Sequence, residues 1–470
     1  MDGRSSAARR QSASRRAISR LLALFVLTAM VGACTAEGET AQPDIVLIVT
    51  DDQRWDTLAE MPGLTRTVGE PGVTFDDAFV VNPLCCPSRA SILTGAYSHT
   101  TGIYTNFPPD GGFRAFDDES TLATWLDDAG YQTALIGKYF NGYEDPSYIP
   151  PGWDRWNAFM HGHPLYYDYT MSVDGEPETF GAAPEDYSTD VLAGMAERFI
   201  DETSSSEPLF LYLAPSAPHQ PQLLPPRDEA AQPRTTFRPG PNIREPDVSD
   251  KPAYIRALPR GHVEESLERW TQQVLTLRAV DDLVVRTVDA LRARGRLDDT
   301  LIIFMSDNGT AVGEHRWQYK LTPYEESIRI PMMIRYDPIT RGTSTGAIVA
   351  NVDIAPTIAE VAGVDAPGSE GVSLVDLLRG DVSRVRSELL IEHLQYRSPP
   401  HADPPTYCAL RTTRRLFVHY ATGEEELYDL RADPYQLSNL AGDPASQATL
   451  DRLRRSTRQR CQPVPPGFSW

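Results

Sequence analysis

The chain has 470 residues, and 65 acidic against 44 basic side chains give it a net charge of −21. A surface this acidic repels nucleic acids and acidic polymers as a whole, so any anionic ligand must be held by a local group of cations. The length is sufficient for one large domain and a smaller one.

The N-terminal segment has the anatomy of an export signal. Six arginines precede the apolar stretch 21–31, which is shorter than the ~20 residues of a membrane-spanning helix. Val31-Gly32-Ala33-Cys34 resembles a bacterial lipobox, which predicts cleavage before Cys34 and lipidation of its thiol. Residues 1–33 are then a signal peptide and 34–42 a tether, and the exported protein contacts the membrane only through its lipid anchor. Plain secretion with cleavage nearby is the alternative.

From residue 43 onward, apolar strands alternate with helices. Continuous apolar runs predict strands buried on both faces at 44–50, 131–137, 208–214 and 300–306. Apolar residues at a spacing of three to four predict helices at 119–129, 187–202 and 264–294. This alternation indicates an α/β fold, in which a large, mainly parallel sheet lies between layers of helices.

Two segments depart from this pattern. Prolines crowd the stretch 214–260, and an irregular stretch of that length inside a compact domain is more often a functional loop than core. We therefore place a main domain at 43–385 and a small C-terminal subdomain, an antiparallel sheet with a helix, at 386–470. Within the subdomain the pattern predicts strands at 388–393, 414–420 and 425–430 and a helix at 445–457.

Polar side chains follow two of the predicted strands, at the ends where α/β sheets place their ligands. Asp51 and Asp52 follow strand 44–50, and Asp307 and Asn308 follow strand 300–306. These oxygens suit Ca²⁺ or Mg²⁺, and adjacent carboxylates repel each other unless a cation lies between them. The alternative is that Asp51 and Asp307 only cap the turns that follow. Because both pairs follow buried strands, a metal site is favoured.

The run Cys85-Cys86-Pro87-Ser88-Arg89 predicts a turn that enters a helix, with Pro87 at the first helical position and Gly95 at the end. Cys86 is then expected to be the N-cap. The positive end of the helix and Arg89, one turn along, would form an anion site beside the thiol of Cys85. A buried cysteine pair in an ordinary turn is the alternative.

The same run resembles the sulfatase signature, Cys-x-Pro-Ser-Arg followed by Thr-Gly, in which the cysteine is oxidised to formylglycine after translation. Lys138, His219 and Lys320 match the family pattern in order and context, and the likeness extends from residue 44 to about 335. The resemblance implies a formylglycine-dependent sulfatase of the alkaline phosphatase superfamily, with that superfamily's fold. It also implies a formylglycine-generating enzyme as a partner during maturation.

The resemblance implies a nucleophile and a metal site. Formylglycine at Cys85 would be hydrated, and one of its hydroxyls would attack the sulfur of a sulfate monoester. The metal, Ca²⁺ or Mg²⁺, and Arg89 would lower the proton affinity of that hydroxyl. The second hydroxyl lets the enzyme-bound ester collapse by elimination. The implied metal ligands are Asp51, Asp52, Cys85, Asp307 and Asn308.

The resemblance also assigns the remaining cations. Lys138 and Lys320 would hold the sulfate oxygens together with the metal. His219 or Lys320 would protonate the departing alcohol. In isolation each of these residues would more often be a solvated surface group.

Within the family, the chain resembles glycosaminoglycan 6-O-sulfatases that act on N-acetylglucosamine 6-sulfate and related glucosamine units. The likeness lies in segments 137–141, 166–170 and 406–412. The first segment is also a departure, because most sulfatases have His two residues after the lysine, where this chain has Phe140. Asn141 is then the nearest polar group, and we expect Asn141 and His315 to contact a sulfated small molecule or glycan.

The five cysteines can be assigned once the family is named. With Cys34 carrying lipid and Cys85 converted, three remain. The placement of Cys408 and Cys461 is similar to that of a cysteine pair in the 6-O-sulfatases, and exported proteins form disulfides in an oxidising compartment. We expect these two to be bonded and Cys86 to be a bystander.

Three functions fit these observations. A sulfatase acting on a sulfated sugar or an aryl sulfate is favoured. A phosphonate or phosphate ester hydrolase of the same superfamily is the second, because both substrates are tetrahedral anions. The third, an inactive lipid-anchored glycan-binding protein, is opposed by the complete set of reactive and ligating residues. The natural substrate stays open, because specificity depends on loops such as 141–185 and 214–260.

Overall fold

The computed structural model describes residues 42–162, 165–396 and 403–470. The predicted signal peptide 1–33, the lipidated Cys34 and nearly all of the tether 34–42 lie outside the described residues. Among the described helices, none has the length and apolar character needed to cross a membrane. The fold described below is that of Pro43–Trp470, which forms one compact unit.

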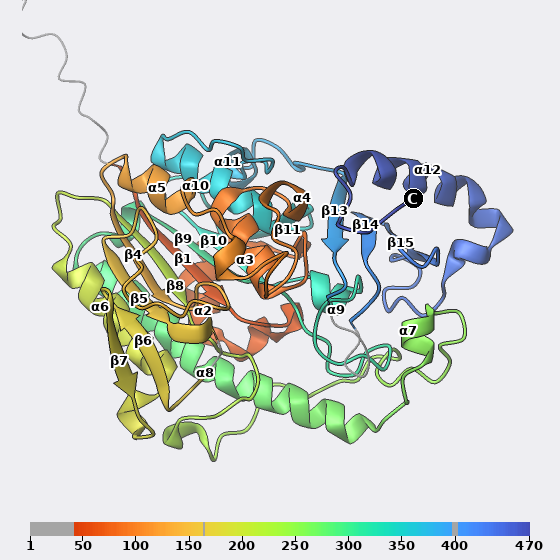
Figure 1. The fold of residues 1–470 in the computed structure, drawn as a ribbon. Coiled ribbons are helices and arrows are strands. Elements are labelled where there is room, and N and C mark those ends of the chain that lie inside the picture. The colour runs from red at the N-terminus through yellow and green to blue at the C-terminus, as the bar shows by residue number, and fades with distance from the viewer. Residues whose placement is uncertain (1–41, 163–164, 397–402) are drawn as a thin grey trace, which may run out of the picture. The chain divides into compact units, whose positions relative to one another are not determined.

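The main sheet has ten strands in the order β11-β2-β10-β9-β1-β8-β4-β5-β6-β7 (Figure 1). The centre of the sheet, from β9 to β5, is parallel, and antiparallel pairs flank it on both sides. The ten strands are β1 (Asp44–Thr50), β2 (Val73–Phe75), β4 (Gln132–Gly137), β5 (Arg155–Phe159), β6 (Tyr169–Val173), β7 (Glu176–Phe180), β8 (Leu209–Ala214), β9 (Thr300–Ser306), β10 (Met332–Arg335) and β11 (Thr343–Thr345).

Helices cover both faces of this sheet, and other helices and short strands lie around it (Figure 1). The described helices are α2 (Pro62–Leu64), α3 (Cys85–Thr94), α4 (Ser98–Thr101), α5 (Leu122–Asp127), α6 (Ser188–Glu202), α7 (Ala253–Arg256), α8 (Val263–Ala293), α9 (Glu325–Ile328), α10 (Ile354–Ala362), α11 (Val375–Arg379) and α12 (Gln447–Arg460). A separate two-stranded sheet pairs β3 (Ala78–Phe79) with β12 (Val349–Ala350).

The alternation of side chains along the strands builds two cores. On β1, Ile45, Leu47 and Val49 face a cluster that includes α3, α5, α10 and α11. Val46 and Ile48 face the opposite cluster, which includes α6 and α8. Successive side chains of a strand point to opposite faces, so a strand between two helix layers must be apolar throughout. The predicted mainly parallel sheet between helix layers is thereby confirmed.

Helix ends follow local signals. Thr121 and Thr124 form a capping box that starts α5 at Leu122, three residues after the predicted start. Helix α8 matches its predicted range within one residue, although Leu267, one of the apolar residues whose spacing predicts the helix, is 46% exposed. The N-terminal end of α8 is therefore packed less extensively against the core than the spacing of its apolar residues predicts.

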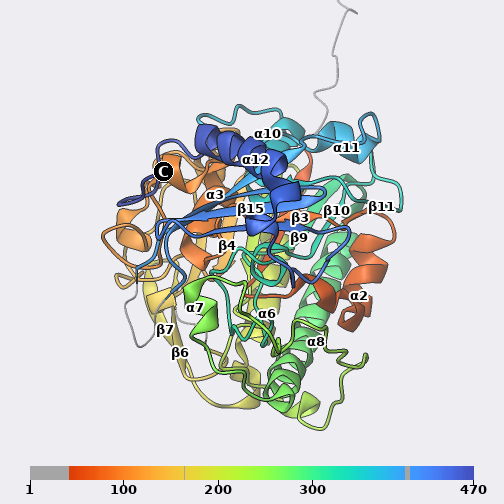
Figure 2. The ribbon, with the colours of Figure 1, turned by 90° about the vertical axis from the view of Figure 1, so that its right-hand side faces the viewer.

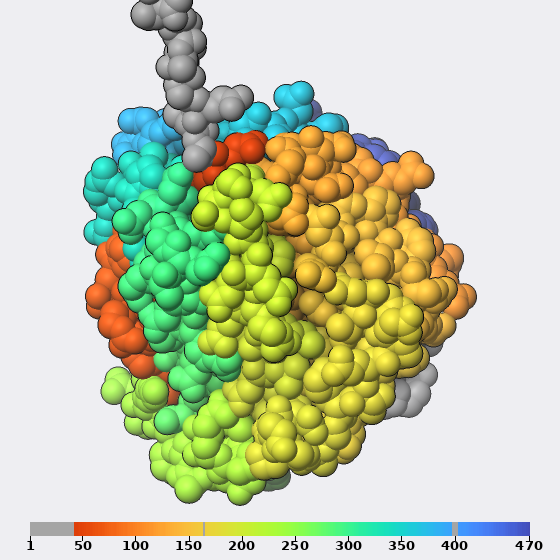
Figure 3. All heavy atoms as spheres, turned by 90° about the vertical axis from the view of Figure 1, so that its left-hand side faces the viewer, coloured from red at the N-terminus to blue at the C-terminus, as the bar shows by residue number. Residues whose placement is uncertain are grey.

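On the face of the molecule shown in Figure 3, helix α6 and the strands β5 to β7 line a surface groove.

The C-terminal segment forms a four-stranded antiparallel sheet that comprises β13 (Glu388–His393), β14 (Tyr407–Thr412), β15 (Arg415–Tyr420) and β16 (Glu425–Asp429). Helix α12 covers one face through Leu450 and Leu453 (Figure 2). The other face packs against residues of the main fold, including Phe79 and Tyr324. The small antiparallel sheet with its helix is as predicted, and the proposed boundary at 385 falls between α11 and β13.

The expected disulfide between Cys408 and Cys461 is present, with a Cα–Cα distance of 6.4 Å. It joins β14 to the C-terminal end of α12, and both sulfurs are buried with Leu390 and Phe468. The bond therefore fixes the helix to the sheet that it covers.

We predict that Cys461→Ser lowers the free energy of unfolding by about 4 kcal/mol, because the bond closes a loop with a sequence separation of 53. Urea denaturation of oxidised protein would measure the change. Dithiothreitol should lower the stability of wild type by a similar amount and leave the variant unchanged. Equal stabilities of oxidised wild type and variant would contradict the prediction.

Candidate active site

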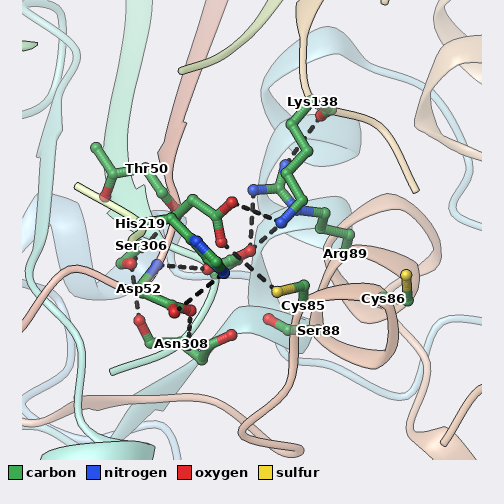
Figure 4. A network of polar contacts seen from close by, with 12 residues as sticks. Thr50, Asp52, Cys85, Cys86, Ser88, Arg89, Lys138, His219, Ser306 and Asn308 are labelled. Atoms are coloured by element: carbon green, nitrogen blue, oxygen red, sulfur yellow. Dashed lines mark hydrogen bonds and ion pairs between the residues drawn. The ribbon is translucent and has the colours of Figure 1, made fainter. Parts of the chain in front are cut away.

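The residues that follow four neighbouring parallel strands lie together at one edge of the sheet. In the order β9, β1, β8 and β4, these are Asp307 with Asn308, Asp51 with Asp52, the loop that carries His219, and Lys138. Helix α3 brings Cys85 to the same place (Figure 4). Residues more than 250 positions apart thus meet, because parallel strands have their carboxyl ends at one edge.

Cys85 is the first residue of α3, and its sulfur lies 3.5 Å from Asp51 Oδ1. The amide of Ser88 donates to the carbonyl of Leu84, so the helix begins at Cys85 and Leu84 is its N-cap. The expectation that Cys86 is the N-cap is therefore wrong. Pro87, predicted to be the first helical residue, is the third instead. It is tolerated there because the first N–H groups of a helix have no intrahelical partner. Gly95 ends the helix at φ +70°, as predicted.

The carboxylates are close enough to share one ion. Ligand atoms of Asp51, Cys85 and Asp307 all lie within 4.8 Å of one another. Asn308 Nδ2 donates to Asp52 Oδ1 at 2.7 Å, while its buried Oδ1 accepts no hydrogen bond from any described residue. An unused buried oxygen beside three carboxylates fits a hard cation, which prefers oxygen ligands. The donor set therefore suits Ca²⁺ or Mg²⁺.

Two lysines contact this cluster. Lys138 Nζ lies 2.5 Å from Asp51 Oδ2, and Lys320 Nζ lies 2.5 Å from Asp52 Oδ1. Lys320 Nζ is also 2.8 Å from the sulfur of Cys85. The side chain of Cys85 is thus flanked by a carboxylate on one side and a lysine on the other.

Burial and charge together set the protonation of the cluster. Burial opposes ionisation of Asp51, but Lys138, His219 and Lys320 outweigh it and hold its pKa well below the usual range. Burial and the negative charge of Asp51 raise the pKa of Asp307. Burial also raises the pKa of Cys85 to about 11, although both lysines favour the thiolate. The unmodified thiol is therefore protonated at neutral pH and a weak nucleophile.

Arg89 is a third cation of the site and lies on the same helix as Cys85. Its Nε and Nη2 lie 3.0 and 2.9 Å from Asp307 Oδ2, and its Nη1 donates to the carbonyl of Lys138 at 3.0 Å. The side chain is 1% exposed. Burial works against its charge, but Asp307 raises the pKa of Arg89 further, so it remains a cation. Arg89 thus links α3, β4 and β9 at the base of the site.

His219 lies at the rim, with Nε2 3.5 Å from Asp52 Oδ2. Its Nδ1 contacts the carbonyl of Gln220 at 2.5 Å, and since a carbonyl only accepts, Nδ1 carries a hydrogen. The hydroxyl of the buried Tyr166 donates to the carbonyl of His219 at 2.7 Å. Sequence reasoning noted the segment of Tyr166 but assigned it no role, because its partner is a main-chain atom 53 residues away.

A cavity of about 700 Å³ opens above Cys85, and we refer to it as the active-site cavity. Of the predicted residues, it is lined by Asp52, Cys85, Lys138, Asn141, His219 and Lys320. Lining residues that the sequence did not reveal include Asn106, Phe107, Arg244, Arg316 and Trp317. Arg244 comes from the proline-rich stretch 214–260. The sequence predicts this stretch to be a functional loop, but it does not single out Arg244 within it.

Phe140 and His315 do not line this cavity. Phe140 is fully buried and stacks on Phe116 with ring centroids 4.5 Å apart. His315, expected to contact substrate, is also fully buried and does not line the cavity, which corrects that expectation. Its Nδ1 lies 2.7 Å from Glu245 Oε2, so its partner is a carboxylate inside the protein. Asn141 lines the cavity, and its contact with substrate stays a prediction.

A larger cavity, of about 920 Å³, lies elsewhere and is lined by Arg54, Trp270 and Arg411 among others. It contains neither Cys85 nor either of the two lysines. Arg54 and Arg411 are paired there with Glu314 and Glu325. Chemistry rather than size therefore identifies the smaller cavity as the candidate site.

We predict that Arg89→Leu lowers the free energy of unfolding by about 3–5 kcal/mol, because it leaves Asp307 buried without its partner. Urea denaturation with a chelator present would measure this. Arg155→Leu is the matched control, since the Arg155–Asp174 pair is exposed and should contribute at most about 1 kcal/mol. Similar small losses in both variants would show that the buried pair adds no stability.

Known proteins are similar to this chain in sequence and in fold. The model of the family "Sulfatase" matches residues 43–364, and that of "N-sulphoglucosamine sulphohydrolase, C-terminal" matches residues 313–462. N-acetylglucosamine-6-sulfatase of Homo sapiens is 32% identical over 90% of this chain and 85% of its own. The extracellular sulfatase SULF-1 homolog of Drosophila melanogaster is 32% identical over 72% of this chain and 31% of its own.

Among solved structures, a complex of a protein with its substrate D-glucosamine-2-N,6-O-disulfate superimposes with a TM-score of 0.78. The two sequences are 25% identical, and the alignment covers 89% of this chain and 97% of the other. The family match spans more than half of the chain, and the human relative aligns over most of it. This protein is a member of the sulfatase family, a sulfuric ester hydrolase.

Proposed function

We propose that this sulfatase removes the 6-O-sulfate group from a glucosamine-type sugar. The observation that carries the proposal is the placement of Cys85 at the base of a cavity, between Asp51 and Lys320 and beside Lys138. A sulfate group entering this cavity would meet cations on two sides. The sugar is inferred from relatives, because the human protein is an N-acetylglucosamine-6-sulfatase and the solved complex holds a 6-O-sulfated glucosamine.

The proposal includes two groups that this chain would have to carry. Formylglycine derived from Cys85 would supply a hydrated aldehyde as nucleophile, and a divalent ion would supply a Lewis acid. Asp51, Asp52, Asp307 and Asn308 would hold the ion together with the converted residue. Ca²⁺ is favoured over Mg²⁺, because six or seven oxygens could gather there once substrate binds. A formylglycine-generating enzyme is the implied maturation partner.

The remaining steps belong to side chains already in place. Lys138 and Lys320 would bind sulfate oxygens and offset the negative charge that develops on them. Arg89 pairs with Asp307 and favours its ionised form. His219 can give a proton to the departing alcohol from Nε2, since its Nδ1–H is committed to the carbonyl of Gln220. Tyr166 holds the carbonyl of His219 and so positions this group.

The proposed location is the cell surface. Residues 1–33 would act as a signal peptide, and Cys34 would carry lipid. A relative in Drosophila melanogaster is an extracellular sulfatase, which is consistent with export. Globomycin treatment of a bacterial expression host should leave the leader attached if Cys34 is the cleavage site.

The substrate prediction is tested with the protein made alongside a formylglycine-generating enzyme. We expect release of sulfate from N-acetylglucosamine 6-sulfate and little hydrolysis of an aryl phosphate. Cys85→Ala should lower kcat by at least about 10⁴-fold, because it removes the nucleophile. Ion chromatography of released sulfate would measure both rates. Faster hydrolysis of aryl phosphate than of every sulfate tested would refute the proposal.

Cys86→Ala is the matched control for that variant. Its sulfur lies 3.5 Å from Asn141 Oδ1 and apart from the network of polar contacts around Cys85 (Figure 4), so we expect a substantial fraction of wild-type activity. Mass spectrometry of the peptide should place the aldehyde on Cys85. An active preparation with an unmodified Cys85, or with the aldehyde on Cys86, would overturn this assignment.

The metal prediction is tested by binding, apart from activity. Wild type should bind one Ca²⁺ per chain by calorimetry, and Asp307→Asn should weaken binding by more than about 100-fold. Asp44→Asn is a suitable control, because Asp44 lies at the opposite end of β1 and pairs with Arg296. Undiminished Ca²⁺ binding by Asp307→Asn would show that the ion binds elsewhere.

A further inference from the structure

Lys320 lies in a segment with a strained backbone, residues 311–321, which we refer to as the Lys320 segment. This conformation is unfavourable for residues that carry a Cβ, and it persists only where contacts from the surrounding structure impose it. The contacts that hold the segment therefore determine where Lys320 lies. Four of its residues other than glycine have φ in the left-handed region: His315 (49°), Arg316 (64°), Tyr319 (77°) and Leu321 (82°).

The ends of the Lys320 segment close on each other. The amide of Ala311 donates to the carbonyl of Tyr319 at 2.6 Å, and the amide of Tyr319 donates to the carbonyl of Ala311 at 2.8 Å. Lys320 follows directly, and its carbonyl accepts from Trp317 Nε1 at 2.8 Å. The carbonyl of the next residue accepts from the hydroxyl of Tyr407 on β14 at 2.9 Å. The main chain is thus fixed on both sides of the lysine, whose side chain is 12% exposed.

Arg316 ties the Lys320 segment to the proline-rich stretch 214–260. Its Nε donates to the carbonyl of Glu245 at 2.9 Å, and its Nη2 donates to that of Pro246 at 2.8 Å. Its Nη1 donates to the carbonyl of Leu258 at 3.2 Å. Three carbonyls from two places along the stretch thus converge on one guanidinium, whose rigid fork of donors suits such a set.

Two interpretations of Arg316 follow, because it also lines the active-site cavity. No carboxylate of a described residue pairs with it, so as a cation it could bind the substrate anion directly. However, the side chain is partly buried, and three of its N–H groups are committed to main-chain carbonyls. Since Arg316 itself has φ of 64°, these bonds also offset the strain at its own position. Placement of the segment is the interpretation that accounts for both observations.

Buried contacts of the preceding residue join the same two parts of the chain. The amide of His315 donates to the carbonyl of Asn242 at 2.8 Å. His315 Nδ1 also lies 2.7 Å from Glu245 Oε2, and both of these side chains are buried. The proline-rich stretch and the Lys320 segment are therefore joined at residue 315, and Arg316 extends this junction toward Lys320.

We propose that Arg316 is a positioning residue that holds Lys320 in place against residue 85 and Asp52. Its three bonds keep the strained segment closed, so that Lys320 Nζ stays 2.8 Å from the sulfur of Cys85 and 2.5 Å from Asp52 Oδ1. Without them, the segment relaxes toward ordinary φ values and the ammonium group moves. The inference rests on the proposed role of Lys320 in sulfatase action and deepens it, because it gives the proline-rich stretch control over that lysine.

A double-mutant cycle tests whether Arg316 acts through Lys320. The variants are Arg316→Gly, Lys320→Ala and the double variant, each made alongside a formylglycine-generating enzyme. Their kcat/KM values are divided by the aldehyde fraction that mass spectrometry finds. Glycine accepts φ of 64°, so Arg316→Gly removes the three bonds without adding strain.

We expect Arg316→Gly alone to lower kcat/KM by roughly 10- to 100-fold, because a misplacement of about 1 Å can lower a rate by ~10²-fold. In the Lys320→Ala background, the same change should lower kcat/KM by less than about twofold, since the group that it positions is already absent. A loss of stability alone would lower the activity equally in both backgrounds.

Two further variants separate charge from geometry. Arg316→Lys keeps the positive charge, but one ammonium group does not reproduce the fork, so this variant should be impaired nearly as much as Arg316→Gly. Arg256→Ala is the matched control, because Arg256 lies in the same proline-rich stretch and donates to the carbonyl of Lys251 at 2.5 Å. It does not line the active-site cavity, so we expect wild-type kcat/KM.

Amide hydrogen exchange gives a measurement that does not depend on activity. The amides of Ala311 and Tyr319 are protected by the bonds that close the Lys320 segment. Their exchange should be faster by at least about tenfold in Arg316→Gly, because local opening becomes easier, and unchanged in Arg256→Ala.

The outcomes keep this inference apart from the proposed function. Equal losses of kcat/KM in both backgrounds, full activity of Arg316→Lys, or unchanged exchange in Arg316→Gly would each overturn the positioning role. The cycle is measured with N-acetylglucosamine 6-sulfate and with an aryl sulfate. Hydrolysis of the aryl sulfate alone would refute the proposed sugar substrate, while the cycle and the exchange rates still decide the role of Arg316.

Discussion

The site depends on a balance of charges that have been taken out of water. Asp51, Asp307, Arg89 and Lys138 are all at most 1% exposed, and none of them could be ionised there alone. Each carboxylate pairs with a cation from another element, so these ion pairs hold helix α3 and the strands β1, β4 and β9 together. Removing one partner leaves the other uncompensated, which makes the same residues important for stability and for chemistry.

The sequence was sufficient to predict the elements that carry this balance. Strand β1 and strand β9 were predicted to the residue, because strands covered on both faces are continuously apolar. The polar residues that follow these two strands could be placed at the same edge of the sheet from the topology alone. The proposed reactive cysteine was chosen by resemblance to a short signature, since helix geometry by itself does not distinguish Cys85 from Cys86.

The sequence could not reveal contacts between residues far apart in the chain, where the partner is a main-chain atom or a single side chain. Tyr166 reaches the carbonyl of His219, and Arg244 enters the cavity from an irregular, proline-rich loop. Short strands such as β2 and the edge strand β11 are three residues long and have no detectable period. His315 was misassigned because its motif position implies contact with substrate, whereas its actual partner, Glu245, lies 70 residues earlier in the chain.

The burial of Cys85 limits the time at which another enzyme could modify this residue. Its side chain is almost fully enclosed, and the rims of the cavity come from segments as late as residue 403. Another enzyme cannot draw such a side chain into its own active site without unfolding α3 and the contacts around it. The proposed conversion of Cys85 would therefore have to occur while the chain is still extended, and a chain that folded first would keep an unconverted thiol. Under this proposal folding and oxidation would compete for the same chain, and the fraction of converted protein would measure that competition.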